Sequence, residues 1–203
     1  MSSFQNTLER HGVDPNRRRF IKLAFFSGLT VFSPGSVLAA ISDCRRPERS
    51  LSLYNPNTRE SLETVYWVDG AYVPGALADI NHIMRDRRTG EIKPIDTHLL
   101  DLLCCIRTEL KTQRPFHVIS GYRSPKTNAL LRRCGKGAAR NSYHLQGKAV
   151  DIRLPGYRLS SLRRTACALK EGGVGYYPRS RFVHVDVGPV RYWSRSKPKK
   201  KKK

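Results

Sequence analysis

The pattern of apolar and polar residues opens with two segments that read as strands. Apolar and polar positions alternate over 49–54 and again over 63–73, on either side of the turn-forming sequence Asn-Pro-Asn-Thr at 55–58. Alternation with a period of two, interrupted by turn residues, is typical of an antiparallel hairpin. We therefore expect the folded domain to begin with two paired strands.

Helical periodicity replaces this alternation from Pro74 onward. Apolar spacing and capping residues predict four helices, over 74–90, over 96–110, after Ser124-Pro125, and over 160–173. Shorter apolar segments predict strands at 116–119, 148–154, 174–177 and 182–187. This order predicts an α+β domain in which helices flank a small, mostly antiparallel sheet.

Length and composition fit one globular domain with charged ends. The chain has 203 residues, of which 39% are hydrophobic and 27% charged, and its formal net charge is +22. Such a charge favours anionic partners. Six of the last seven residues are lysine, and we interpret 196–203 as a disordered polylysine tail. A nucleic-acid-binding protein is one alternative, but the sequence contains no recognition module, and we expect no nucleic-acid partner.

The first forty residues resemble an export signal. Arginines at 17–19 precede a moderately apolar stretch over 23–40, which ends in the small residues Ala39 and Ala40. Paired arginines in this position resemble the twin-arginine export signal of bacteria. The apolar stretch is barely long enough to span a bilayer. We expect export to the periplasm, removal of 1–40, no stable membrane span afterwards, and a folded domain over 41–195.

Five cysteines in an exported chain leave at least one thiol unpaired. Cys104, Cys105 and Cys167 lie in apolar helical segments, where we expect free buried thiols. Cys44 and Cys134 lie in loop-like sequence and form the one disulfide that we expect.

Two of the predicted strands carry polar residues on one face. Alternate residues of a strand share a face, so Asp151 points away from the apolar positions of 148–154, and His184 and Asp186 share the polar face of 182–187. If the two strands are neighbours, Asp151 and His184 approach each other. Gly147 lets the preceding loop fold His144 toward them. Two imidazoles and a carboxylate then converge.

This set of donors suits Zn²⁺. Three nitrogen and oxygen ligands leave a fourth position open for water, as in catalytic zinc sites. Bound zinc lowers the pKa of that water toward about 7 and polarises a carbonyl group, which amide hydrolysis requires. Taken singly, each of these residues is more often a core histidine or a strand-end aspartate, so the hypothesis depends on the three together.

The motif Ser-x-His-x-x-Gly-x-Ala-x-Asp at 142–151, with Ser-Gly-Tyr-Arg-Ser at 120–124 before it and His184 after it, resembles a known family. It is similar to the zinc peptidases that share a fold with lysostaphin, D-Ala-D-Ala metallopeptidases and the Sonic hedgehog signalling domain. Over nearly the whole mature chain the sequence resembles the MepK group of murein endopeptidases.

The resemblance implies roles for individual residues. His144, Asp151 and His184 are expected to bind Zn²⁺. Arg123 is expected to face the site and to hold the substrate or the developing oxyanion through donors that are already in place. The alternative for Arg123 is a structural arginine paired with a carboxylate.

One position departs from the family pattern. In several relatives an acidic residue three positions before the last histidine acts as general base, and Arg181 occupies that position here. Asp186 is our candidate for accepting the proton. Alternatively, Asp186 orients one of the ligand histidines.

The implied function is zinc-dependent hydrolysis of peptide bonds in the stem peptides and cross-links of peptidoglycan, most consistently by an endopeptidase. The alternatives are a D,D- or L,D-carboxypeptidase that trims stem peptides, and a non-catalytic zinc-containing protein that binds peptidoglycan. The missing acid at position 181 favours the last of these.

Overall fold

The computed structural model describes residues 47–135 and 138–195. The export segment expected at 1–40 and the polylysine tail expected at 196–203 lie outside the described residues, and both stay predictions. Among the helices that are described, none is long and apolar enough to cross a membrane.

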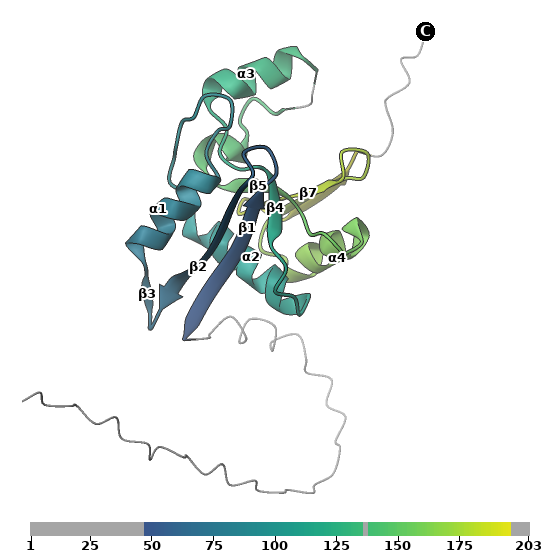
Figure 1. Cartoon of the computed structure of the whole chain (residues 1–203). Helices are drawn as coiled ribbons and strands as arrows, with labels where there is room; N and C mark the ends of the chain where they lie inside the picture. Colours follow the sequence, from purple (N-terminus) through teal and green to yellow (C-terminus); the bar gives the residue numbers. More distant parts are fainter. Residues whose placement is uncertain (1–46, 136–137, 196–203) are drawn as a thin grey trace, which may run out of the picture. The chain divides into compact units, whose positions relative to one another are not determined.

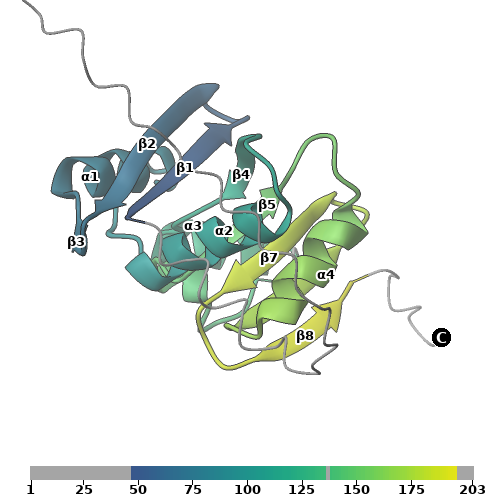
Figure 2. The same cartoon turned by 90° about the horizontal axis from the view of Figure 1, so that it is seen from below.

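One sheet of eight strands forms the centre of the domain, in the order β3-β2-β1-β4-β5-β7-β6-β8. Figure 1 and Figure 2 show β1, β2, β4, β5 and β7 within it. Its strands are β1 Glu48–Asn55, β2 Glu60–Val68, β3 Ala71–Tyr72, β4 Phe116–Ser120, β5 Ala149–Arg153, β6 Gly173–Tyr177, β7 Phe182–Asp186 and β8 Arg191–Ser194. Neighbouring strands of the described residues pair antiparallel, except that β1 is parallel to β4 and β6 is parallel to β8. The predicted α+β class and the mostly antiparallel sheet are confirmed, but the sheet is larger than the six strands expected.

The opening hairpin is confirmed, with one correction. β1 and β2 pair from Glu48 opposite Val68 to Asn55 opposite Glu60. The single strand expected over 63–73 is wrong, because Asp69 and Gly70 take positive φ angles of 47° and 92° and form a turn. Aspartate and glycine tolerate this left-handed conformation, and β3 therefore returns along β2.

The four predicted helices are present, with different ends. They are α1 Pro74–Ile83, α2 Thr97–Glu109, α3 Pro125–Arg133 and α4 Leu159–Leu169. The helix expected to reach Gly90 ends at Ile83, because the buried Asp86 carboxylate instead accepts hydrogen bonds from the backbone N–H groups of Arg88 and Ser124. The helix expected to reach Gly173 ends at Leu169, followed by Lys170 in the left-handed conformation.

The two faces of the central strands have different surroundings. Val150 and Ile152 of β5 and Val183 and Val185 of β7 belong to the buried cluster that also contains the apolar faces of α2 and α4. The predicted alternation along both strands is therefore confirmed, and the polar residues lie on the opposite face of the sheet.

The cysteine predictions are partly wrong. Cys134 is free and exposed at the C-terminal cap of α3, so the expected disulfide between Cys44 and Cys134 does not form. Cys104 and Cys167 are free, as expected, whereas Cys105 is disulfide-bonded.

Candidate metal centre

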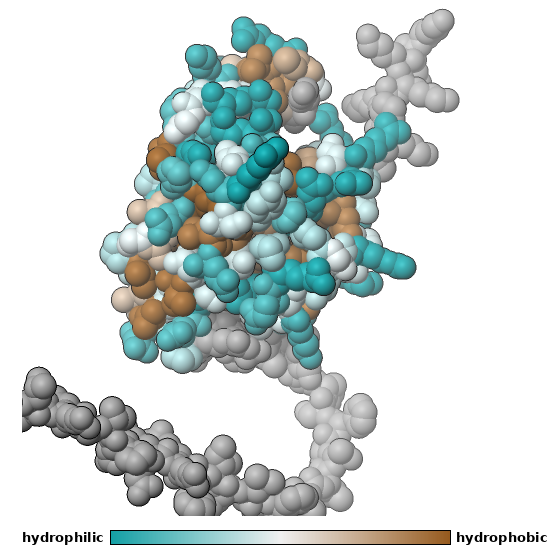
Figure 3. Space-filling model, viewed as in Figure 1, coloured by the Kyte–Doolittle hydropathy of each residue, from teal (hydrophilic) through white to brown (hydrophobic). Residues whose placement is uncertain are grey.

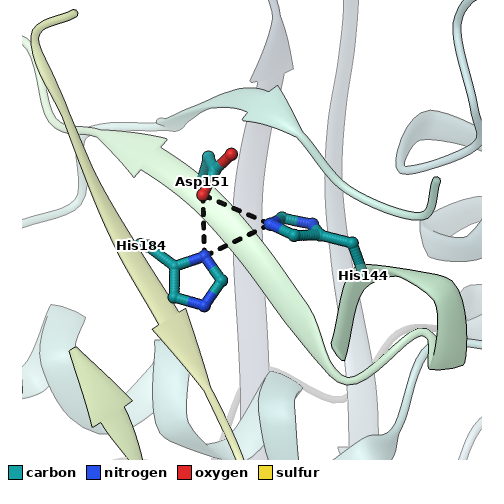
Figure 4. Close-up of side chains that lie close together, drawn as sticks. All are labelled: His144, Asp151 and His184. Atoms are coloured by element: carbon teal, nitrogen blue, oxygen red, sulfur yellow. Dashed lines mark hydrogen bonds and ion pairs between the residues drawn. The ribbon is translucent and has the colours of Figure 1, made fainter. Parts of the chain in front are cut away.

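Three side chains from separate parts of the chain meet on the polar face of the sheet (Figure 4). Asp151 of β5 lies directly across from His184 of β7 in the antiparallel ladder. His144 comes from the short 3₁₀ helix η1, Tyr143–Gln146, which precedes β5. All three side chains are buried.

The three facing atoms are close enough to share one ion. Asp151 Oδ1 lies 2.9 Å from His184 Nδ1 and 3.3 Å from His144 Nε2, and the two nitrogens are 3.2 Å apart. Tetrahedral zinc with ligand distances of about 2.0–2.2 Å separates its ligand atoms by roughly 3.3–3.6 Å. The donor types and the spacing therefore fit a zinc ion with only small movements of the side chains.

The position of His144 depends on the turn that follows it. Gly147 ends η1 with φ 70°, and a Cβ atom at this position would collide with the backbone oxygen of Pro94. The His144 ring is fixed on its other edge, where Nδ1–H donates to the backbone oxygen of Gly121 over 2.7 Å. This bond selects the tautomer that leaves Nε2 free to bind a metal.

His184 is fixed in the same way by Asp186. Its Nε2–H donates to Asp186 Oδ2 over 2.9 Å, so Nδ1 is the nitrogen that faces Asp151 and His144. Asp186 is fully buried. Its carboxylate lies on the edge of the His184 ring opposite the ligand atoms, and also accepts bonds from the backbone N–H groups of Gly173 and Gly188.

The electrostatics of the metal-free centre favour a cation. Burial lowers the pKa of His184, but hydrogen bonds to Asp151 and Asp186 outweigh it and raise that pKa to about 9. The pKa of His144 is lowered, because burial lowers it more than the attraction to Asp151 raises it. Burial would raise the pKa of Asp151, but the two histidines hold it well below its usual value. A metal ion that binds here replaces a proton on His184.

Arg123 lies beside the three ligands and is nearly buried, with 9% of its surface exposed. Its Nη2 is 3.8 Å from Asp151 Oδ2, and its two terminal nitrogens donate over 3.4 Å to Asn128 Oδ1 and Ser120 Oγ. Its Nε–H has no partner. Burial lowers the pKa of Arg123, more than Asp151 and Asp86 raise it. Arg123 therefore lies near a carboxylate, as expected of a structural arginine. It also lines the cleft, as expected of an arginine that holds the substrate.

His144, Asp151 and His184 line a cleft of about 1550 Å³. Its described lining contains one carboxylate, that of Asp151, and six arginines: Arg87, Arg88, Arg123, Arg179, Arg191 and Arg195. The exposed Arg181 does not line it, and lies in the turn between β6 and β7 with φ 55°. The cleft is therefore cationic apart from the metal ligands.

Sequence reasoning missed Arg191 and Trp193 of β8, which both line the cleft. Arg191 forms a paired contact with Asp186, with Nη2 2.7 Å from Oδ2 and Nη1 3.1 Å from Oδ1. The sequence did contain one indication of this contact. Gly173 and Gly175 are alternate residues of β6, and a strand that has no side chains on one face lets side chains of the next strand cross it.

An α+β domain with a His/Asp/His group that could hold a metal ion, on the wall of a cleft, is typical of a metal-dependent hydrolase. Comparison with known sequences identifies the family within that class. The sequence model of the family described as peptidoglycan L,D-endopeptidase MepK matches residues 44–193, and the chain belongs to this family of M15 metallopeptidases. The predicted resemblance is thereby confirmed.

Individual relatives match along almost their whole length. The peptidoglycan L,D-endopeptidase MepK of Escherichia coli (strain K12) is 41% identical over 180 residues, which are 89% of this chain and 98% of that protein. The MepK protein of Shigella flexneri gives the same values. The probable peptidoglycan L,D-endopeptidase MepK of Haemophilus influenzae is 40% identical over 183 residues, 89% of this chain and 97% of that protein.

Proposed function

We propose that this protein is a zinc-dependent peptidoglycan endopeptidase that hydrolyses peptide cross-links in the periplasm. The observation that carries the proposal is the convergence of His144, Asp151 and His184 on one point of a cationic cleft. Membership of the MepK family, whose relatives are named for cleaving peptidoglycan, supplies the substrate class. The expected export signal supports the periplasmic location.

The three ligands would hold the metal through His144 Nε2, His184 Nδ1 and Asp151 Oδ1. When bound, zinc supplies an acidified water and a polarised carbonyl. The protein contributes the fixed orientation of the ligands, because Gly121 O and Asp186 hold the far edges of the two imidazole rings.

Arg123 is assigned to the substrate. A guanidinium that lines the cleft, with its Nη2 3.8 Å from Asp151 Oδ2, supports hydrogen bonding to the oxygen of the scissile amide. A donor that is already in place stabilises negative charge as it develops on that oxygen. Asn128 and Ser120 hold the guanidinium in position.

We assign Asp186 to orienting His184 rather than to accepting a proton from water. Both of its oxygens already accept hydrogen bonds, from His184 and Arg191 and from two backbone N–H groups, and the residue is fully buried. These bonds outweigh its burial and lower the pKa of Asp186, which makes it a weak base.

An endopeptidase is favoured over a carboxypeptidase because the described lining of the cleft comes from both sides of the sheet. Arg87 and Arg88 follow α1, which packs against β1 and β2, whereas Arg179 and Arg195 lie at the β6 and β8 side of the sheet. A cross-linked peptide extends in both directions from the bond that is cut, and such a cleft accommodates it.

The test is to digest purified sacculi with the mature, zinc-loaded protein and to separate the products chromatographically. We expect loss of cross-linked muropeptides, prevented by a chelator and restored by zinc. Trimmed stems with the cross-links intact would instead identify a carboxypeptidase. Retention on sacculi with no change in the products would identify a non-catalytic binding protein and refute the proposal.

A further inference from the structure

Strand β6 separates the metal ligand strand β7 from the edge strand β8, and two of its residues are glycines. Gly173 pairs with Asp186 on one side and with Arg191 on the other. A Cβ atom at Gly173 would lie 2.5 Å from Asp186 Oδ2 and 2.7 Å from Arg191 Nη1. The absence of a side chain at this position is therefore what lets Arg191 reach across β6 to Asp186.

The second glycine repeats the arrangement two residues later. Gly175 pairs with His184 on one side and with Trp193 on the other. A Cβ atom there would lie 2.6 Å from the Trp193 ring. The indole accordingly crosses β6 and lies with its ring centroid 5.3 Å from that of His184. Its Nε1–H donates to the hydroxyl of Tyr177 over 2.9 Å, which fixes its orientation.

The Arg191 guanidinium is itself held on several sides. Its paired contact with Asp186 matches the fork of a guanidinium to the two oxygens of a carboxylate. It lies 5.1 Å from the Tyr143 ring centroid and 5.2 Å from that of Trp193, and Nη1 also donates to the backbone oxygen of Pro189. Its place is thus determined by β8, by the loop before it and by η1.

We propose that Arg191 is a positioning residue for the metal ligand His184 and acts through Asp186. Arg191 fixes the Asp186 carboxylate, Asp186 fixes the Nε2–H of His184, and the ring then presents Nδ1 to the metal. Trp193 packs beside the same ring and restricts its tilt. The inference rests on the proposed function, because it requires His184 to be a ligand.

The contact between Arg191 and Asp186 differs from a surface ion pair, because the carboxylate is buried. Asp186 is fully buried. A buried carboxylate that loses its guanidinium partner keeps its charge in surroundings of low dielectric constant, which is unfavourable. Its Oδ1 would still accept from the N–H groups of Gly173 and Gly188, but His184 alone would hold its Oδ2, so the carboxylate could rotate and would fix the imidazole ring less firmly. Removing a residue that orients a metal ligand typically weakens metal binding about 10- to 100-fold.

The experiment compares the variants Arg191→Met, Arg191→Lys, Asp186→Asn and the double variant Arg191→Met/Asp186→Asn. Zinc affinity is measured by competition with a chelator, and ligand geometry by the visible spectrum of the cobalt-loaded protein. We expect zinc affinity about tenfold or more weaker in Arg191→Met, an intermediate loss in Arg191→Lys, and altered cobalt spectra. Because Arg191 acts through Asp186, the double variant should bind zinc no more weakly than Asp186→Asn alone.

The matched control is Arg195→Met, an exposed arginine just after β8 that lines the same cleft, and it should keep wild-type zinc affinity. Wild-type affinity and spectrum in a folded Arg191→Met would overturn the inference, as would losses that simply add in the double variant. A raised KM with zinc affinity and kcat unchanged would overturn it too, and would assign Arg191 to substrate binding.

If thermal unfolding shows that Arg191→Met does not fold, Arg191→Lys decides: weaker zinc binding supports the inference, and wild-type binding overturns it. Failure of the proposed function is seen separately, because it would appear as a wild-type protein that does not bind zinc in this centre.

Discussion

Each histidine of the centre is held at the edge of its ring that points away from Asp151 and from the other histidine. Gly121 O accepts from His144, and Asp186 accepts from His184, so one tautomer of each ring is selected. The predicted approach of Asp151 and His184 followed from strand alternation, because that periodicity fixes which residues share a face, and His144 was added through the turn at Gly147. Of the partners on the far edges, Asp186 was predicted as one of two alternatives, whereas Gly121 O could not be predicted because a backbone oxygen carries no side-chain signal.

At the level of single ligands, His144→Ala should abolish zinc binding and hydrolysis. The change removes one of three ligands, and the remaining pair cannot complete the site. Metal analysis of the purified variant and muropeptide chromatography measure the two losses. His98→Ala, which removes an exposed histidine at the start of α2, is the control and should match the wild type. Full zinc occupancy in His144→Ala would remove the ligand assignment.

A second prediction concerns the pair formed by Glu60 and Arg85. Hydrogen bonds from Arg85, and then from Thr58, lower the pKa of Glu60 from 4.5 to about 2. A lowered pKa in the folded state stabilises the protein above pH 4.5, and this stabilisation is lost as the pH falls toward 2. Because the pair is partly exposed, Glu60→Gln should reduce the free energy of unfolding by only about 0.5–1 kcal/mol at pH 7.

Urea denaturation of the wild type and of Glu60→Gln at several pH values measures this difference. It should shrink steadily between pH 4.5 and pH 2. A difference that stays constant over this range would show that the Glu60 carboxylate does not stabilise the fold through its charge.

At the scale of elements, the order of helices and long strands was predictable and the short edge strands were not. β3 has two residues and β8 has four, too few for a period of two to stand out. β8 is placed by its pairing with β6, to which it lies parallel. Sequence periodicity therefore gave no sign that Arg191 would reach a residue of β7. Only the two glycines in β6 indicated a close approach of neighbouring side chains.

The turn between η1 and β5 gives the prediction at this scale. Gly147→Ala combines a positive φ with a collision against Pro94 O, and overpacking of this kind typically costs about 1–3 kcal/mol. We expect lower stability together with weaker zinc binding, because His144 must move. Thermal unfolding and chelator competition measure both.

The variant Gly90→Ala separates the effect of the positive φ angle from the effect of the collision with Pro94 O. Gly90 also has a positive φ, of 76°, but no atom would lie within 4 Å of the added Cβ. This control should lose some stability and keep wild-type zinc affinity. Equal effects of the two substitutions on zinc affinity would show that the turn does not position His144.

At the scale of the whole molecule, the cleft where the substrate is proposed to bind is rich in arginine. Hydrophilic side chains cover most of the face shown in Figure 3. Within the cleft, arginines flank the ligands on both sides, and Asp151 is the one carboxylate of the described lining. The net charge was evident from composition. The positions of the arginines around His144, Asp151 and His184 depend on the α1–α2 and β6–β7 connections, whose paths periodicity does not predict.

The cationic cleft predicts how charge affects catalysis. Stem peptides carry free carboxylates, so replacing Arg88 and Arg179 together with glutamine should raise KM roughly two- to thirtyfold, from about 0.2–1 kcal/mol for each of the two exposed charges, with little change in kcat. The difference should diminish at high salt, which screens exposed charges.

Steady-state kinetics on a cross-linked peptide at low and high salt tests this. Arg164→Gln removes an exposed arginine of α4 that is not part of the cleft lining and should behave as the wild type. A lowered kcat with unchanged KM in the double variant would contradict a role in substrate binding.

The proposed hydrolysis depends on one cation shared by three side chains. Anomalous diffraction at the zinc edge, from a crystal of the zinc-loaded protein, tests it most directly. We predict one strong peak bonded to His144 Nε2, Asp151 Oδ1 and His184 Nδ1 at about 2.0–2.2 Å, with a further position open to the cleft. A peak elsewhere, or none within bonding distance of these three atoms, would contradict the account.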